Sequence, residues 1–147
     1  MIHLVLTPTE YLLGQDPNEL NLLEVLRLAR EGFELADVDS MLSACQLYQS
    51  NDIISRIAGR SAKAVRKLIA AGKTFRLSYQ QSVLAYQYAK VLESATSVFG
   101  CQRIAEGWLS KPCKQLAGIV PLDAIDNAIG FRAVEDYLER VVCGVYQ

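Results

Sequence analysis

Apolar residues recur at three- and four-residue steps along most of this 147-residue chain, which is the spacing of amphipathic helices. Asp16, Pro17 and Glu19 have the features of a helix start: an acidic cap, a proline at the first helical position and a glutamate three residues after the cap. We expect a helix to follow at once and to end at Gly32, and a second helix to lie between residues 34 and 48. The inward faces predicted from the spacing are Leu22, Val25, Leu26 and Ala29 in the first helix, and Leu35, Val38, Leu42 and Cys45 in the second.

Residues 51–71 have the pattern of two short helices around a tight turn, as in a helix-turn-helix. We expect Ser50 to cap the first helix and Gly59 to lie in the turn, where a positive φ is needed. The second helix is expected to begin near Ser61. The predicted inward positions are Ile53, Ile54, Ile57 and Ala58 in the first helix, and Val65 and Leu68 in the second. A plain helical hairpin in a bundle has the same spacing, so the pattern alone leaves both interpretations open.

A long helix with a wide apolar face is expected from Tyr79 to Phe99. After Gly100, another helix is expected to end before Pro112, and a further one to open at Pro121 and be broken by Gly130. A last helix follows. The simplest interpretation of Trp108, Leu109, Leu116 and Leu122 is that they form the core of this part of the chain.

The predicted fold is therefore all-α, with a helix-turn-helix lobe followed by a second compact helical lobe. We place an N-terminal helical region at residues 1–78 and a C-terminal domain at residues 79–147. No stretch rich in Gly, Ser or Pro separates them, so the long helix is expected to join the two lobes.

Composition narrows the function classes. About half of the residues are hydrophobic and 21% are charged, as in ordinary globular proteins. The first six residues lack the basic flank of a signal peptide, and no apolar run is long enough to cross a bilayer, so we expect a cytoplasmic protein that does not bind membranes. The four cysteines are scattered and the single histidine is His3. We therefore expect reduced thiols, no metal and no cofactor, and an enzyme is the least favoured class.

The net charge of −1 conceals a strong segregation of charge. Residues 1–52 contain nine acids and two bases, residues 53–90 contain eight bases and no acid, and residues 91–147 contain seven acids and five bases. Such a basic segment attracts a phosphate backbone. It is also explained by pairing with the acidic N-terminal segment of the same chain or of a second copy. If the two short helices are a DNA-binding motif, the candidate contacts are Arg60, Ser61, Lys63, Arg66, Lys67 and Lys73.

The last fifty or so residues contain a series of motifs in a definite order. They are Ser97-Val98-Phe99-Gly100, then Ala105-Glu106-Gly107-Trp108-Leu109-Ser110-Lys111-Pro112, then Leu116-Ala117-Gly118-Ile119-Val120-Pro121-Leu122-Asp123, and finally Gly144-Val145-Tyr146-Gln147. In that order and spacing they resemble the toxin-binding domain of Xre/MbcA/ParS-type antitoxins, which are partners of RES-domain toxins that attack NAD. The resemblance extends roughly from Ile53 onward. It departs from the family at Ala117, where glycine is commoner, and at Cys143, where a polar or charged residue is frequent.

The resemblance implies a non-enzymatic antitoxin that binds its toxin through the C-terminal lobe, with the chain end at or near the toxin's NAD site. We further expect a homodimer that binds its own operator DNA, since a helix-turn-helix dimer reads two half-sites about one helical turn apart. The toxin-binding residues that the resemblance indicates are Trp108, Leu109, Lys111, Arg140, Gly144, Val145, Tyr146 and Gln147. The residues alone also fit a helical transcription regulator whose C-terminal lobe serves dimerisation or ligand sensing. The alternative for Val145 and Tyr146 is a frayed or self-packed terminus.

Overall fold

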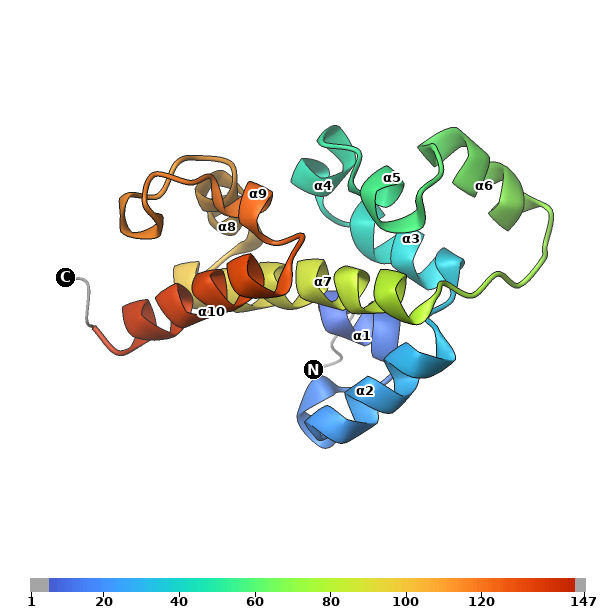
Figure 1. Cartoon of the computed structure of the whole chain (residues 1–147), viewed down its shortest axis with the longest axis horizontal. Helices are drawn as coiled ribbons and strands as arrows, with labels where there is room; N and C mark the ends of the chain where they lie inside the picture. The colour runs from blue at the N-terminus through green and yellow to red at the C-terminus, as the bar shows by residue number, and fades with distance from the viewer. Residues whose placement is uncertain (1–5, 145–147) are drawn as a thin grey trace. The chain divides into compact units, whose positions relative to one another are not determined.

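The computed structural model describes residues 6–144, and within that range the chain forms ten α-helices, two short 3-10 helices and no strand (Figure 1). The predicted all-α class is confirmed. The contacts divide the chain into two compact units, Met1–Tyr86 (unit 1) and Gln87–Gln147 (unit 2), and the division falls within one long helix.

Unit 1 is organised around a central helix, α3. Its elements are α1 (Pro8–Leu13), η1 (Pro17–Glu19), α2 (Leu22–Glu31), α3 (Leu35–Ser43), α4 (Gln46–Ser50), α5 (Ile53–Ala58), α6 (Ala62–Ala70) and the start of α7 (Tyr79–Phe99). Helix α3 contacts α1, α4, α5 and α6. The fully buried side chains at this centre are Leu35, Val38, Met41, Cys45, Tyr48, Ile53, Ile57 and Val65.

The first predicted helix is divided into two elements. Asp16 caps only η1, through a hydrogen bond from the Asn18 N–H to Oδ1 (2.9 Å), and Leu20 then returns to an extended conformation. Asn21 is the cap of α2 and accepts the Glu24 N–H at 2.9 Å. Helix α2 ends at the predicted Gly32.

The predicted inward face of α2 is wrong at two positions. Val25 and Ala29 are buried, whereas Leu22 is 75% exposed and Leu26 is 37% exposed. The neighbouring Leu23 is 74% exposed as well. Unit 1 therefore covers only part of the apolar face of α2.

The second predicted helix is also two helices, because Ala44 ends α3 and Cys45, in an extended conformation, precedes α4. Ser50 is the last residue of α4 and does not cap α5. That position belongs to Asp52, which has a φ of 54° and accepts a hydrogen bond from the Ser55 hydroxyl (2.8 Å). Ser50, Asn51 and Asp52 are consecutive and all three residue types favour the cap position, so the sequence does not identify which of them caps α5.

The segment after α2 lies antiparallel to the segment before α7. The Leu35 N–H donates to the Phe75 carbonyl (2.8 Å), and the Leu77 N–H donates to the Phe33 carbonyl (2.9 Å). Gly32 allows this approach because it has a φ of 92°, and a Cβ there would lie 2.3 Å from the Leu77 oxygen.

Unit 2 consists of the remainder of α7, α8 (Gln102–Leu109), η2 (Lys114–Leu116), α9 (Pro121–Ala124) and α10 (Ala128–Val142). Two side chains tie α7 to the rest: Gln87 Nε2 donates to the Ile125 carbonyl (2.8 Å), and the Ser94 hydroxyl donates to Glu135 Oε1 (3.3 Å). The buried apolar side chains include Leu92, Ala95, Ala105, Leu109, Cys113, Leu122, Ile125, Val134 and Leu138.

Gly130 does not break a helix, contrary to the prediction. It is the third residue of α10, and its N–H donates to Oδ1 of the capping Asn127 (2.7 Å). A Cβ at position 130 would lie 1.9 Å from the Ala124 carbonyl oxygen. Glycine is therefore required here by the close approach of α9 to the first turn of α10.

The four cysteines are all free thiols. Cys45 and Cys113 are buried, Cys101 is half-buried, and Cys143, directly after α10, is exposed.

Candidate functional site

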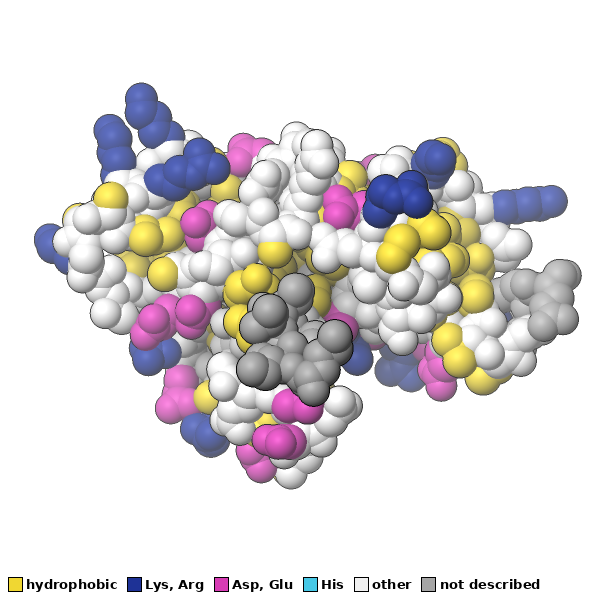
Figure 2. Space-filling model, turned by 180° about the vertical axis from the view of Figure 1, so that it is seen from behind, with side chains coloured by type: hydrophobic (Ala, Val, Ile, Leu, Met, Phe, Trp, Pro, Cys, Tyr) yellow, Lys and Arg dark blue, Asp and Glu magenta, His cyan; other side chains and the backbone are white. Residues whose placement is uncertain are grey.

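The first candidate surface is the basic face of α6, which we define as Lys63, Arg66 and Lys67. Ser61 caps α6 by accepting the Ala64 N–H (3.1 Å), and Val65 is fully buried. Lys63 and Lys67 are each two residues from Val65 and lie about 160° from it around the helix, Arg66 lies about 100° from it, and all three side chains are exposed. Figure 2 shows Lys and Arg side chains projecting together over α6, at the upper left of that view.

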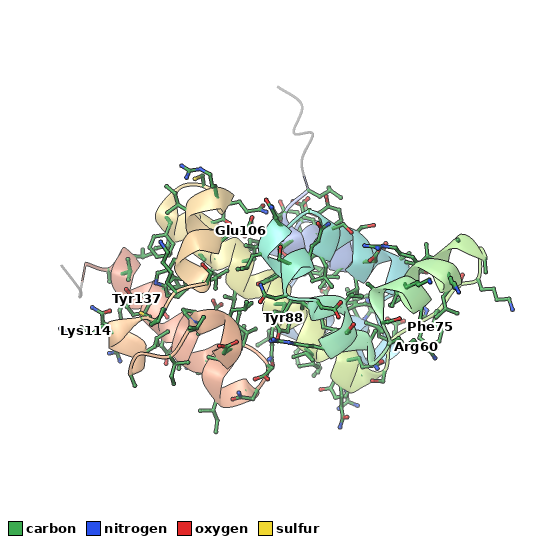
Figure 3. All side chains as sticks on the ribbon, turned by 90° about the horizontal axis from the view of Figure 1, so that it is seen from above. Arg60, Phe75, Tyr88, Glu106, Lys114 and Tyr137 are labelled. Carbon is green, nitrogen blue, oxygen red and sulfur yellow. The ribbon has the colours of Figure 1, made fainter. Side chains whose placement is uncertain are left out.

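The turn between α5 and α6 is as tight as the sequence predicts. Gly59 ends α5 with a φ of 70°, and only Arg60 and Ser61 separate it from α6. Arg60 lies over the Phe75 ring, with the guanidinium carbon 5.0 Å from the ring centroid (Figure 3). This cation–π contact holds the Arg60 guanidinium over the ring. Lys73 is exposed after the end of α6.

Intramolecular pairing neutralises little of the basic segment. Among the described residues, one ion pair joins it to the acidic N-terminal segment, between Arg76 and Glu34 at 3.7 Å. No carboxylate in the described range lies within ion-pair distance of Lys63, Arg66 or Lys67. The positive charges of the basic face are therefore not neutralised by the described part of the chain and can attract an anionic partner.

The second candidate surface is in unit 2 and is centred on Trp108. Its ring stacks on Tyr137 with centroids 5.5 Å apart and an interplanar angle of 5°, and its other neighbour is Phe99 at 5.4 Å. We call these three side chains the aromatic platform. Trp108 is half-buried and not fully in the core, and Ile104, one turn earlier on α8, is 46% exposed.

The other predicted toxin-binding residues are in different environments. Leu109, the next residue on α8 after Trp108, is fully buried. Lys111 and Arg140 are exposed, and Gly144 follows α10 with a φ of 75°. Val145, Tyr146 and Gln147 lie outside the described residues.

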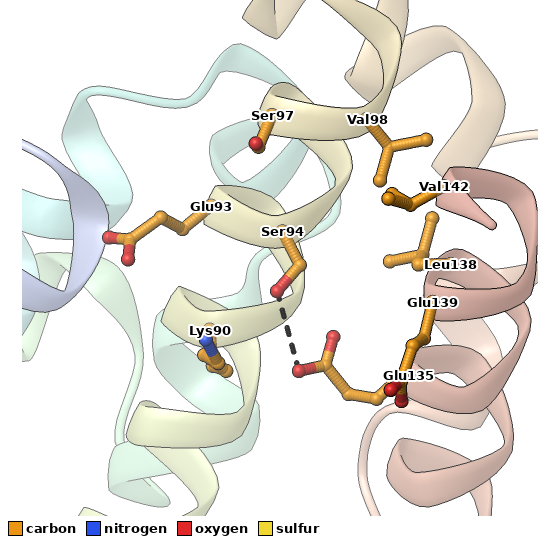
Figure 4. A pocket seen from close by; sticks show the side chains of 9 residues that line it. All are labelled: Lys90, Glu93, Ser94, Ser97, Val98, Glu135, Leu138, Glu139 and Val142. Carbon is orange, nitrogen blue, oxygen red and sulfur yellow. Dashed lines mark hydrogen bonds between the residues drawn. The ribbon is translucent and has the colours of Figure 1, made fainter. Parts of the chain in front are cut away.

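A groove between α7 and α10 was not predicted from the sequence. It has a volume of about 420 Å³ and is lined by Lys90, Glu93, Ser94, Ser97, Val98, Glu135, Leu138, Glu139 and Val142 (Figure 4). Glu135 Oε2 is buried there without a hydrogen-bond donor among the described residues. Burial raises the pKa of the Glu135 carboxyl, and Lys90 and the Ser94 hydroxyl oppose the shift only in part.

This environment predicts a pH-dependent stability. The pKa of Glu135 is higher in the folded than in the unfolded chain, so the protonated carboxyl favours the folded state. This stabilisation is complete below the ordinary pKa of 4.5 and is lost as the pH rises through the pKa of the folded state. We expect Glu135→Gln, which keeps a partner for Ser94, to raise the free energy of unfolding at pH 7 by less than about 1 kcal/mol, since the group is partly solvated. The gain should shrink toward pH 4.

Urea denaturation of the two proteins at pH 7 and pH 4 measures this difference. Asp126→Asn, at an exposed carboxylate of unit 2 that does not contribute to the Glu135 shift, is the control and should leave the pH dependence unchanged. An equal stability of wild type and Glu135→Gln at both pH values would contradict the assignment.

The described residues contain no group of three or more His, Cys, Asp or Glu side chains placed to hold a metal ion. None of the helices in the described range is long and apolar enough to span a membrane.

Comparison with known protein families identifies one domain in this chain. Residues 94–141 match the family model "Antitoxin Xre/MbcA/ParS C-terminal toxin-binding domain". The matched segment runs from the end of α7 to the end of α10 and contains the aromatic platform. The predicted resemblance is confirmed over these residues, a narrower range than the sequence motifs indicated. No curated protein matches the chain.

Proposed function

We propose that this chain, whose residues 94–141 match an antitoxin toxin-binding domain, neutralises a RES-type NAD-degrading toxin and represses its own operon by binding operator DNA. The observation that carries the proposal is the family match, because it supports an antitoxin role independently of any single residue. The protein is proposed to act in the cytoplasm, as a homodimer and without catalytic activity or a cofactor of its own.

The toxin is proposed to dock on the exposed side of the aromatic platform and the end of α10. Stacked aromatic side chains give a rigid, amphipathic contact area that loses little entropy on binding. Ile104 extends this area, and Lys111 and Arg140 supply positive charge at its margin. Leu109 has no exposed surface, so its proposed role is to position Trp108.

Residues 145–147 are proposed to enter the toxin's NAD site. Helix α10 is a rigid support that ends at Val142, and the left-handed Gly144 ends the helical path before the tail. A short tail with one aliphatic and one aromatic side chain fits a concave pocket, and the helix before it limits the entropy lost on docking.

Deleting Val145–Gln147 tests this arrangement directly. We expect neutralisation to weaken about tenfold or more, because the truncated chain keeps the docking surface in unit 2 but loses the residues proposed to enter the toxin's NAD site. The measurement is NAD consumption by the toxin titrated with full-length or truncated chain. A truncated chain that neutralises as well as the full chain would overturn the plugging role, and the exposed Ile129→Ala variant controls for general damage to unit 2.

Operator binding is proposed for the basic face of α6. A helix that exposes Lys63, Arg66 and Lys67 to solvent carries the residue types that contact phosphates and guanine edges in a major groove. The N-terminus of α6, capped by Ser61, adds a positive helix dipole at the same end.

A helical transcription regulator without a toxin partner is the alternative. Co-purification of the tagged chain with the product of the neighbouring gene distinguishes the two functions. A stable complex that suppresses NAD consumption supports the antitoxin, and the absence of any such complex would support the regulator.

A further inference from the structure

An apolar groove lies on the surface of unit 1, between α2 and the first two turns of α7. Its volume is about 410 Å³, and its lining contains no charged side chain: Leu22, Leu23, Val25, Leu26, Ala29, Tyr79, Val83 and Tyr86. We call it the α2 groove. Leu22 and Leu23 are 75% and 74% exposed, so the groove has an apolar wall that the described part of the chain leaves uncovered. Clustered leucines of this kind mark a contact surface.

The groove is built by side chains with defined positions. Val25 and Ala29 are buried, whereas Leu22 and Leu26, which are four residues apart and share a face of α2, are exposed. At the C-terminal end of α2, the Arg30 guanidinium lies over the Tyr79 ring, 5.4 Å from its centroid. The exposed apolar stripe therefore ends at a cation.

Charge at the two ends of α2 indicates what the groove binds. Asp16 and Glu19, in the turn before α2, are exposed acids, whereas Arg30 is an exposed base in the last turn. Arg27 is already paired with Glu31 at 2.9 Å, so Arg30 is the cation available at that end. A second α2 in the antiparallel direction brings its acidic end to Arg30 and its leucines to the same stripe.

This arrangement is self-complementary. A two-fold axis near Leu26 generates both charge contacts at once, as an isologous interface requires. Helix α2 has ten residues and is about 15 Å long, so both ends are within reach of a second copy aligned along it. A strongly charged peptide would find no charged partner in the lining of the groove.

We propose that the α2 groove is the contact surface between two copies of this chain, which pair through antiparallel α2 helices. The proposal deepens the proposed function, because such a dimer carries two copies of the α6 basic face, as recognition of a two-part operator requires. It nevertheless depends only on self-association, which is measurable without toxin or DNA.

Sedimentation velocity of the full chain over a range of concentrations tests the proposal. We expect wild type to dimerise and Leu23→Glu to raise the dissociation constant at least a hundredfold, because it places a carboxylate in the apolar contact of each subunit. Ile129→Glu is the matched control, at an apolar side chain that is 85% exposed in unit 2, and should dimerise like wild type. Circular dichroism confirms that each variant is folded.

A charge exchange tests the antiparallel direction. Arg30→Glu should weaken the dimer about tenfold, and adding Glu19→Arg should restore most of the loss, since the exchanged pair again has opposite signs. A wild-type monomer at all concentrations, or a dimer that Leu23→Glu leaves intact, would overturn the proposal.

Two other occupants give different results. If residues 1–5 of the same chain cover the groove, their deletion should create a dimer that the full chain lacks. If the toxin covers it, Leu23→Glu should abolish the toxin complex and leave the oligomeric state unchanged. Either result overturns the proposal. If instead Leu23→Glu breaks the dimer but the chain neutralises no toxin, the dimer proposal stands and the proposed antitoxin function is rejected.

Discussion

Gly130→Ala is expected to destabilise unit 2 by about 3 kcal/mol or more, because the added methyl group would lie 1.9 Å from a backbone oxygen. The oxygen belongs to Ala124, the last residue of α9, and cannot move aside as the end of a flexible side chain can. Relief requires α9 to separate from α10, which would disturb the buried Leu122 and Ile125.

Gly107→Ala is the matched control in the same unit. Gly107 lies within α8, has no positive φ, and leaves open space within 4 Å of the position that an alanine methyl group would take. Alanine should therefore stabilise α8 by up to about 1 kcal/mol. Urea denaturation followed by Trp108 fluorescence measures both variants, since this single tryptophan is in unit 2. Similar midpoints for Gly130→Ala and wild type would contradict the close approach of α9 and α10.

Replacement of both Arg66 and Lys67 by alanine is expected to reduce operator affinity a hundredfold or more. Two contacts are lost from each subunit of a dimer, and a specific base or phosphate contact contributes on the order of 1–3 kcal/mol. Both side chains are exposed on α6, so the fold should be retained. Toxin neutralisation should be unchanged, because the proposed docking surface is in unit 2.

Fluorescence anisotropy with the DNA upstream of the chain's own gene, measured at several salt concentrations, tests this expectation. The slope of log affinity against log salt should fall by about one for each phosphate contact removed. Arg132→Ala removes an exposed base of unit 2 and is the control. An unchanged affinity would show that α6 does not contact DNA, and parallel loss of neutralisation would show that the two activities are not separable.

Helical periodicity was sufficient to predict the fold class and most of the elements. The turn at Gly59 and the end of α2 at Gly32 were predicted because a residue with positive φ leaves a clear local signal. Gly130 was misinterpreted because its reason is tertiary: the contact is with Ala124, in another element. The same applies to Leu22, since periodicity identifies an apolar face but not whether the same chain covers it.

The candidate sites were predictable to different degrees. The exposed bases of α6 follow from helix geometry and charge, so the sequence indicated them. The environment of Glu135 depends on Ser94, 41 positions earlier, and on the packing of α10 against α7. No local pattern contains that information.

The exposed thiol of Cys143 makes the end of α10 open to site-specific labelling. Two of the other cysteines are buried and one is half-buried, so an uncharged maleimide dye should attach to Cys143 first. Its position two residues before Val145 places the dye beside the tail without altering the aromatic platform. The natural sequence thus supplies a reporter position for the kinetics of complex formation.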